Sequence, residues 1–123
     1  MTAREMGDKI VAKVSADPKG VSVCELVEDC GSDARGNLTL EFKDNLVLWK
    51  GVSDLFARAI KLALPHIKMA MLPPILVHAL PERLDLPIAK QIRPYKTARW
   101  LPVVLLPKGS RRVAEARRGK KLT

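Results

Sequence analysis

Apolar residues in the first thirty positions recur at the spacing of two short amphipathic helices. The first stripe consists of Met6, Ile10 and Val14. The second consists of Val23, Leu26, Val27 and Cys30. Steps of three and four residues gather side chains on one face, because a helix turns once in about 3.6 residues. The pattern therefore predicts two helices that each bury a single face.

Both helices begin with the same capping pattern. Thr2 precedes Glu5 by three residues, and Ser22 precedes Glu25 in the same way, so each pair can satisfy two free backbone N–H groups. Proline and glycine in residues 17–20 end the first helix, and Gly31 ends the second. This opening is helix-turn-helix-like, although unrelated domains also begin this way and the residues that follow are too few for a recognition helix.

The pattern then changes to period two. Leu38, Leu40 and Phe42 alternate with polar residues, and residues 43–45 separate them from the apolar run 46–49. Alternation on both sides of a short polar turn predicts a β-hairpin. The edges of its strands could pair with a second copy of the chain, so a homodimer is one option.

A third helix is predicted after Gly51. Ser53 provides its cap, and Asp54 places a negative charge in its first turn. The predicted buried face consists of Leu55, Phe56, Ala59, Ile60 and Ala63. Arg58 and Lys61 would lie on the exposed face, and Pro65 bounds the helix.

Residues 62–80 are about as long and as apolar as a membrane span. They also contain three prolines, two histidines and a lysine, which a spanning helix could not hold without partners for its exposed backbone. We therefore expect two buried strands, 67–71 and 75–80, and no membrane contact. Residues 84–88 and 101–106 have the pattern of two further strands, and flanking prolines favour an edge or terminal position for the last one.

Together these elements predict an α+β fold: two short N-terminal helices, a β-hairpin, a third helix and a mainly antiparallel small sheet. The chain has 123 residues, 47% of them hydrophobic, which is enough for one domain with a core. We expect residues 1–107 to form this domain. Residues 108–123 are predicted to be a basic, flexible C-terminal tail.

The two cysteines are predicted to be reduced. Cys24 and Cys30 are six residues apart, which on one helix is about 9 Å along the axis and beyond the reach of a disulfide. A pair at this spacing without nearby histidines does not match a zinc site. Reduced thiols, together with an N-terminus that lacks an apolar leader, favour a cytoplasmic protein.

Charge is concentrated at one end of the chain. Eleven of the twenty-two Lys and Arg residues lie within residues 86–123, where Glu115 is the only acid. The first 85 residues hold as many bases but twelve of the thirteen acids, so they are nearly neutral. A cationic end on a near-neutral body attracts polyanions, nucleic acid above all.

The first binding candidate is a loop that combines cations with two of the five aromatic residues of the chain. Its members are Lys90, Arg93, Tyr95, Lys96, Arg99 and Trp100. Cations pair with phosphates, and flat rings stack on exposed bases. The alternative is that both rings pack onto the sheet while their neighbours are merely solvated.

The second candidate is the tail, which adds seven bases: Lys108, Arg111, Arg112, Arg117, Arg118, Lys120 and Lys121. Such an arm contacts phosphates and gives affinity with little sequence preference, although it could also be a solubilising end. If a helix reads the major groove, the helix with Arg58 and Lys61 fits best, because the one at 23–30 is acidic.

These features favour a small, non-catalytic protein that binds DNA or RNA and needs no cofactor or metal. The alternative is an interaction module, such as an inhibitor or assembly factor, with an acidic protein partner and with Trp49 or Trp100 as an anchor. The chain has none of the common hydrolase, dinucleotide or phosphate-loop motifs. A third option is a metal-independent ribonuclease that uses Tyr95, Lys96 and Arg99 with His66 or His78.

Overall fold

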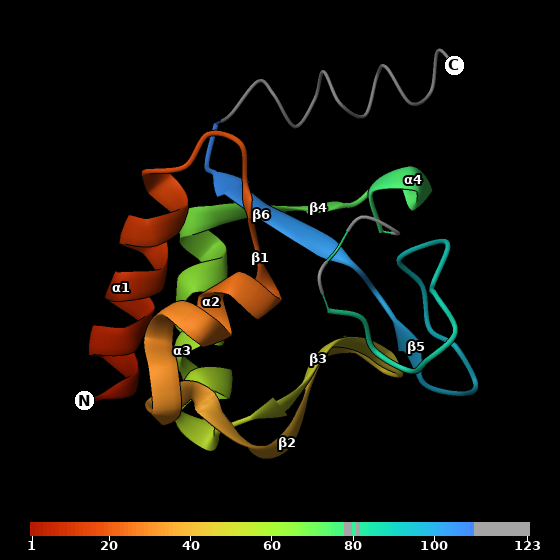
Figure 1. The fold of residues 1–123 in the computed structure, drawn as a ribbon, viewed down its shortest axis with the longest axis horizontal. Helices are drawn as coiled ribbons and strands as arrows, with labels where there is room; N and C mark the ends of the chain where they lie inside the picture. Colours follow the sequence, from red (N-terminus) through yellow and green to blue (C-terminus); the bar gives the residue numbers. More distant parts are fainter. Residues whose placement is uncertain (78–79, 81, 110–123) are drawn as a thin grey trace.

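Each of the three predicted helices begins at its predicted cap. The computed structural model describes residues 1–77, 80 and 82–109, and in it α1 spans Ala3–Ser15, α2 spans Val23–Cys30 and α3 spans Asp54–Ala63 (Figure 1). The N–H of Glu5 donates to Thr2 Oγ1 at 3.1 Å, and the N–H of Thr2 donates to the Glu5 carboxylate at 3.0 Å. Both predicted capping boxes are therefore confirmed.

The described strands form two three-stranded sheets. The first has the order β1–β6–β4, with β1 at Val21–Ser22, β4 at Ile67–Met71 and β6 at Val103–Pro107, and both pairings are antiparallel. The second has the order β2–β3–β5. There β2, at Arg35–Lys43, and β3, at Leu46–Val52, form the predicted antiparallel hairpin. β5, at Arg99–Trp100, pairs in parallel with β3.

The α+β class is confirmed, but the strand predicted at 75–80 is wrong. The short helix α4 spans Pro74–Val77 instead, and residues 78, 79 and 81 lie outside the described part of the chain. Proline is preorganised for the first turn of a helix. The carbonyl of Pro73 accepts from the N–H groups of Leu76 at 2.9 Å and Val77 at 3.3 Å, which begins a helical turn.

The strand predicted at 84–88 is also wrong. Leu84, Leu86 and Ile88 pack half-buried against the core from an irregular segment, and only Ile88 forms a single bridge, to Trp100. The alternation thus reports packing and not a strand. Pro87 explains this in part, since it has no N–H for a sheet and contributes only its carbonyl, to the N–H of Trp100 at 2.8 Å.

The predicted last strand exists and is the last strand of the described chain, but the alternative that placed it at an edge of the sheet is wrong. β6 is the central strand of its sheet and lies between β1 and β4 (Figure 1). Pro102 precedes β6 and Pro107 is its last residue, so Val103–Leu106 all keep the N–H groups that two neighbours require. Two prolines at the ends of a strand are therefore compatible with a central place.

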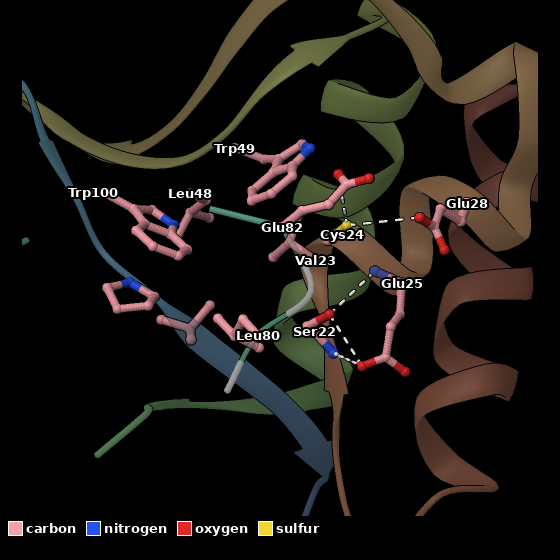
Figure 2. A pocket seen from close by; sticks show the side chains of 12 residues that line it. Ser22, Val23, Cys24, Glu25, Glu28, Leu48, Trp49, Leu80, Glu82 and Trp100 are labelled. Carbon is pink, nitrogen blue, oxygen red and sulfur yellow. Dashed lines mark hydrogen bonds between the residues drawn. The ribbon is translucent and has the colours of Figure 1, made fainter. Parts of the chain in front are cut away.

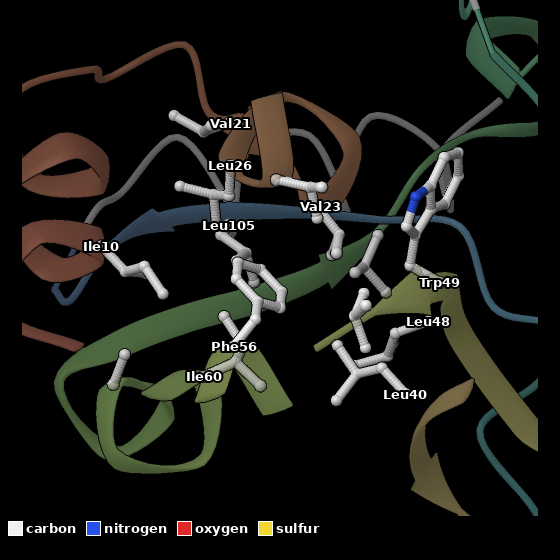
Figure 3. Packing of buried hydrophobic residues seen from close by; sticks show 14 of the residues in the cluster. Ile10, Val21, Val23, Leu26, Leu40, Leu48, Trp49, Phe56, Ile60 and Leu105 are labelled. Atoms are coloured by element: carbon white, nitrogen blue, oxygen red, sulfur yellow. The ribbon is translucent and has the colours of Figure 1, made fainter. Parts of the chain in front are cut away.

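The core lies between α1, α3 and the strands. Figure 3 shows Phe56 and Ile60 of α3 beside Leu105 of β6, and all three side chains are almost completely buried. α1 packs along α3, while β1 separates α1 from α2 in the chain. In a helix-turn-helix a short turn joins the two helices, whereas here the strand β1 lies between them in the chain.

A tight turn carries the chain from α1 into β1. Gly20 has a φ of 98°, and a Cβ at this position would collide with the side chain of Val104 in β6. Glycine is therefore required by both backbone conformation and packing. Among the described residues, no helix is long and apolar enough to cross a membrane.

Candidate nucleic-acid interface

The turn of the β2–β3 hairpin holds the basic loop in place. Asn45, in the turn, donates from its side-chain amide to the carbonyl of Tyr95 at 2.7 Å. The carbonyl of Asn45 accepts from the N–H of Arg99 at 2.8 Å. Asn45 has a φ of 61°, a conformation that asparagine tolerates better than most residues. Two hydrogen bonds thus fix the loop on either side of Lys96.

Two guanidinium groups gather around the one tyrosine of the chain. The carbon at the centre of each guanidinium, in Arg93 and in Arg99, lies 4.8 Å from the centroid of the Tyr95 ring. The Tyr95 hydroxyl accepts from the N–H of Gln91 at 3.3 Å. Cations above an aromatic ring are attracted by its negative face. The ring therefore holds two positive groups close together in the loop.

The environment of Tyr95 favours its ionised form. Desolvation raises the pKa of the phenol, but hydrogen bonds with the backbone of Gln91, the side chain of Arg93 and the backbone of Lys90, together with the charge of Arg93, outweigh it. The pKa of Tyr95 is consequently held below its ordinary value of 10.0. Hydrogen bonds to the phenol cause most of this lowering of the pKa, and the charge of Arg93 adds to it.

The cations of the loop have no acidic partner among the described residues. Lys90, Arg93 and Lys96 are exposed. The two ion pairs within the described part of the chain, Lys13 with Asp29 and Arg58 with Asp54, both lie elsewhere. Arg99 is half-buried, and its Nε is buried without a hydrogen-bond partner within that same part. Within the described residues, three solvated cations and one partly buried one therefore have no ion-pair partner.

Trp100 is not placed to stack on a base. Its side chain is only 2% exposed, and its ring centroid lies 6.3 Å from that of Trp49, which is 9% exposed. The expectation that Trp100 contributes a ring to nucleic acid does not fit this burial. It fits the alternative, in which the ring packs onto the sheet. Neither tryptophan projects as an anchor for a protein partner.

The other predicted residues that the structure describes have partners or neighbours outside the loop. Lys108 donates to the carbonyl of Pro65 at 3.0 Å, and the remaining tail candidates lie outside the described residues: Arg111, Arg112, Arg117, Arg118, Lys120 and Lys121. Arg58 is engaged by Asp54 at 2.8 Å on α3. Lys61 lines a shallow hollow over β2 together with two acids, Glu41 and Asp44. Arg58 and Lys61 thus lie beside acids, unlike the cations of the loop.

The structure does not bring His66 to the other residues of the ribonuclease hypothesis. His66 is exposed at the end of the 3-10 helix η2, Leu64–His66, and lines a hollow between α1 and α3 with Arg4 and Asp8. Tyr95 instead lies against the hairpin turn. His78 lies outside the described residues.

A pocket that the sequence did not indicate lies between α2 and the two sheets. Its walls are the apolar side chains Val23, Leu48, Trp49, Leu80, Trp100, Pro102 and Val103. Figure 2 shows Cys24 between two carboxylates at its rim, with Sγ 3.3 Å from Glu82 Oε2 and 4.0 Å from Glu28 Oε1. Glu28 follows Cys24 by one helical turn, but Glu82 is distant in sequence, so only the fold reveals the cluster.

The thiol of Cys24 is strongly held in its protonated form. Burial, then the hydrogen bond to Glu82 and the charges of Glu82, Glu28 and Glu25, raise the pKa of Cys24 from 9.0 to about 12. The ligand atoms of Cys24, Glu28 and Glu82 lie within 4.8 Å of one another and could serve a metal. They are three, whereas a structural zinc site uses four, and two are exposed carboxylates.

Comparison with known protein families, characterised proteins and solved structures gives no match for this chain. Its function must therefore be argued from its own residues.

Proposed function

We propose that this protein binds nucleic acid through phosphate contacts made by the basic loop and the C-terminal tail. The observation that supports this proposal is the cluster of cations around Tyr95. Arg93 and Arg99 approach the same ring at 4.8 Å, and Lys90 and Lys96 are exposed beside them without an acidic partner in the described part of the chain. Such a cluster raises the local concentration of a polyanion.

The chemistry of the loop favours the phosphate backbone over the bases. Trp100 is buried, and the Tyr95 ring already carries two guanidinium groups, so neither ring is a free platform for stacking. Cation–phosphate contacts give affinity with little sequence preference and depend steeply on salt. The protein should therefore bind many sequences with similar affinity.

Fluorescence anisotropy tests this proposal. Labelled double-stranded DNA, single-stranded DNA and RNA are titrated with the full chain over a salt series. The double variant Arg93→Ala/Lys96→Ala removes two exposed cations from the loop. We expect it to bind more weakly on every sequence and to lower the slope of log affinity against log salt by about 2.

A matched variant distinguishes the effect of losing loop cations from the effect of lowering the net charge of the protein. Arg4→Ala/Lys19→Ala also removes two exposed cations, from α1 and from the turn after it, and should change the slope much less. Neutralising four tail residues in Arg111→Gln/Arg112→Gln/Lys120→Gln/Lys121→Gln tests the contribution of the tail. Absence of binding near physiological salt, or equal losses in loop and control variants, would contradict the proposal.

A further inference from the structure

The pocket beside α2 combines an apolar wall with an acidic rim. Its volume is about 40 Å³, several times the minimum that one water needs and enough for the end of one aliphatic side chain. Three of the residues that line it are acids, Glu25, Glu28 and Glu82, and none is a base. A ligand that fits must bring an apolar group together with positive charge.

The acids of the rim have no cationic partner among the described residues. Both ion pairs of that part of the chain involve other acids, Asp29 and Asp54. Glu25 is engaged in capping α2, whereas Glu28 and Glu82 are exposed beside Cys24. The rim is thus a negative site in a protein whose net charge is +9.

Residues 120–122 combine the positive charge and the apolar side chain that the pocket requires. Leu122 directly follows Lys120 and Lys121, so two cations precede one aliphatic side chain. Arg111 and Arg112 precede Val113 in the same way, earlier in the tail. We propose that Leu122 of the same molecule docks in the pocket and that Lys120 and Lys121 pair with its acidic rim.

Chain length selects Leu122 over Val113. Val103 lines the pocket, and β6 carries the chain away from it, so Gly109 lies roughly 15–20 Å from the pocket at about 3.3 Å per residue. Val113 is four residues beyond Gly109 and spans at most about 14 Å. Leu122 is thirteen residues beyond and spans up to about 45 Å. Gly109, with a φ of 84°, adopts the left-handed conformation typical of a turn in the chain.

Disulfide trapping in the full chain tests this docking directly. The variant Cys30→Ser/Leu122→Cys leaves Cys24 at the pocket as the only partner for a cysteine at position 122. Oxidised glutathione serves as the oxidant, and peptide mapping by mass spectrometry measures the link to Cys24. The matched control is Cys30→Ser/Lys120→Ala/Lys121→Ala/Leu122→Cys, whose new cysteine has the same reach but lacks the two cations proposed to pair with the rim.

We expect the Leu122→Cys variant to form the intramolecular link at least about tenfold faster than the control, because docking raises the effective concentration of the two thiols. Salt at about 1 M should remove most of this advantage by screening the carboxylates. Equal rates, or no link, would overturn the proposal. A link between two molecules would overturn it in favour of a second copy as the occupant.

A second measurement leaves the thiols untouched. Both tryptophans of the chain line the pocket, so their emission reports its occupancy. Leu122→Ser should shift the emission to longer wavelength, and Val113→Ser should not. Identical spectra for the two variants would contradict docking by Leu122. The rim and nucleic acid would compete for Lys120 and Lys121, which the proposed function assigns to phosphate. Neither measurement involves nucleic acid, so both test docking separately from the proposed function.

Discussion

The side-chain amide of Asn45 donates to the backbone carbonyl of Tyr95 at 2.7 Å, between two segments fifty residues apart in the chain. A single residue in a hairpin turn thereby joins the second sheet to the loop that carries the candidate interface. The same residue holds a left-handed backbone conformation, with a φ of 61°. Substitutions can separate the effect of this hydrogen bond from the effect of the backbone conformation.

Asn45→Gly should cost about 1 kcal/mol of unfolding free energy, because it removes the hydrogen bond but tolerates the backbone conformation. Asn45→Ala removes the bond and also strains the backbone, so it should cost about 2–3 kcal/mol. Urea unfolding of both variants measures the difference. Equal losses would show that the conformation at this turn contributes nothing.

Trp100→Phe should lower stability but not the affinity for nucleic acid. The indole is buried against Trp49, so a smaller ring leaves space in the core and should cost about 1–3 kcal/mol. Anisotropy titrations below the melting temperature should then show an unchanged affinity. A loss of more than about fivefold would instead indicate that the ring stacks on a base.

Gly20→Ala should be among the most damaging small substitutions in the chain. It combines backbone strain of about 1–2 kcal/mol with overpacking against Val104 of about 1–3 kcal/mol. Gly109→Ala is the matched control, because its φ is also positive but nothing lies within 4 Å of the added Cβ. Thermal unfolding should give a clearly larger loss for Gly20→Ala, and comparable losses would refute the packing argument.

Cys24 should react slowly with iodoacetamide in the folded protein, because its pKa of about 12 leaves very little thiolate at neutral pH. Glu82→Gln removes a negative charge beside Sγ and should lower the pKa of Cys24. Each pKa unit of lowering raises the thiolate fraction tenfold, but the thiolate also becomes less nucleophilic. The alkylation rate should therefore increase roughly threefold for each pKa unit. Mass spectrometry measures the rate, and Glu41→Gln, a distant exposed acid, should leave it unchanged.

The same thiol should make the protein sensitive to alkali. Its folded pKa of about 12 exceeds the ordinary value of 9.0, so the folded state holds a proton that the unfolded state releases between these values. Stability should therefore be intact below pH 9 and fall as the pH rises toward 12. Cys24→Ser should reduce this alkaline loss in urea titrations, and an identical pH dependence would contradict the assignment.

The first 71 residues follow the sequence-based expectation closely because their signals are local. A cap such as Thr2 with Glu5 lies within one turn of helix, and the alternation in the hairpin acts between neighbours. The basic loop could be proposed from the sequence for a similar reason, since its charge follows directly from its composition. Such local patterns predict structure well because they do not depend on distant parts of the chain.

The later part of the chain differs from the sequence-based prediction where contacts between distant residues determine the structure. Leu84, Leu86 and Ile88 alternate like a strand, yet they pack as an irregular segment because no neighbouring strand pairs with them beyond Ile88 and Trp100 among the described residues. The burial of Trp100 depends on Trp49, fifty-one positions earlier. The rim of the pocket depends on Glu82, which reaches Cys24 from fifty-eight residues away. Sequence spacing alone does not predict contacts between such distant residues.

The central position of β6 sets the order of events during synthesis. β1 and β4 hydrogen-bond to β6 and not to each other, so neither has its sheet partner until residues 103–107 have been made. The first sheet is thus completed only after residues 103–107 have left the ribosome. Closing a sheet across so many residues is slow, and until then both strands stay open to wrong partners. A nascent chain interrupted before residue 103 would lack the strand that joins β1 to β4 and could not close the first sheet.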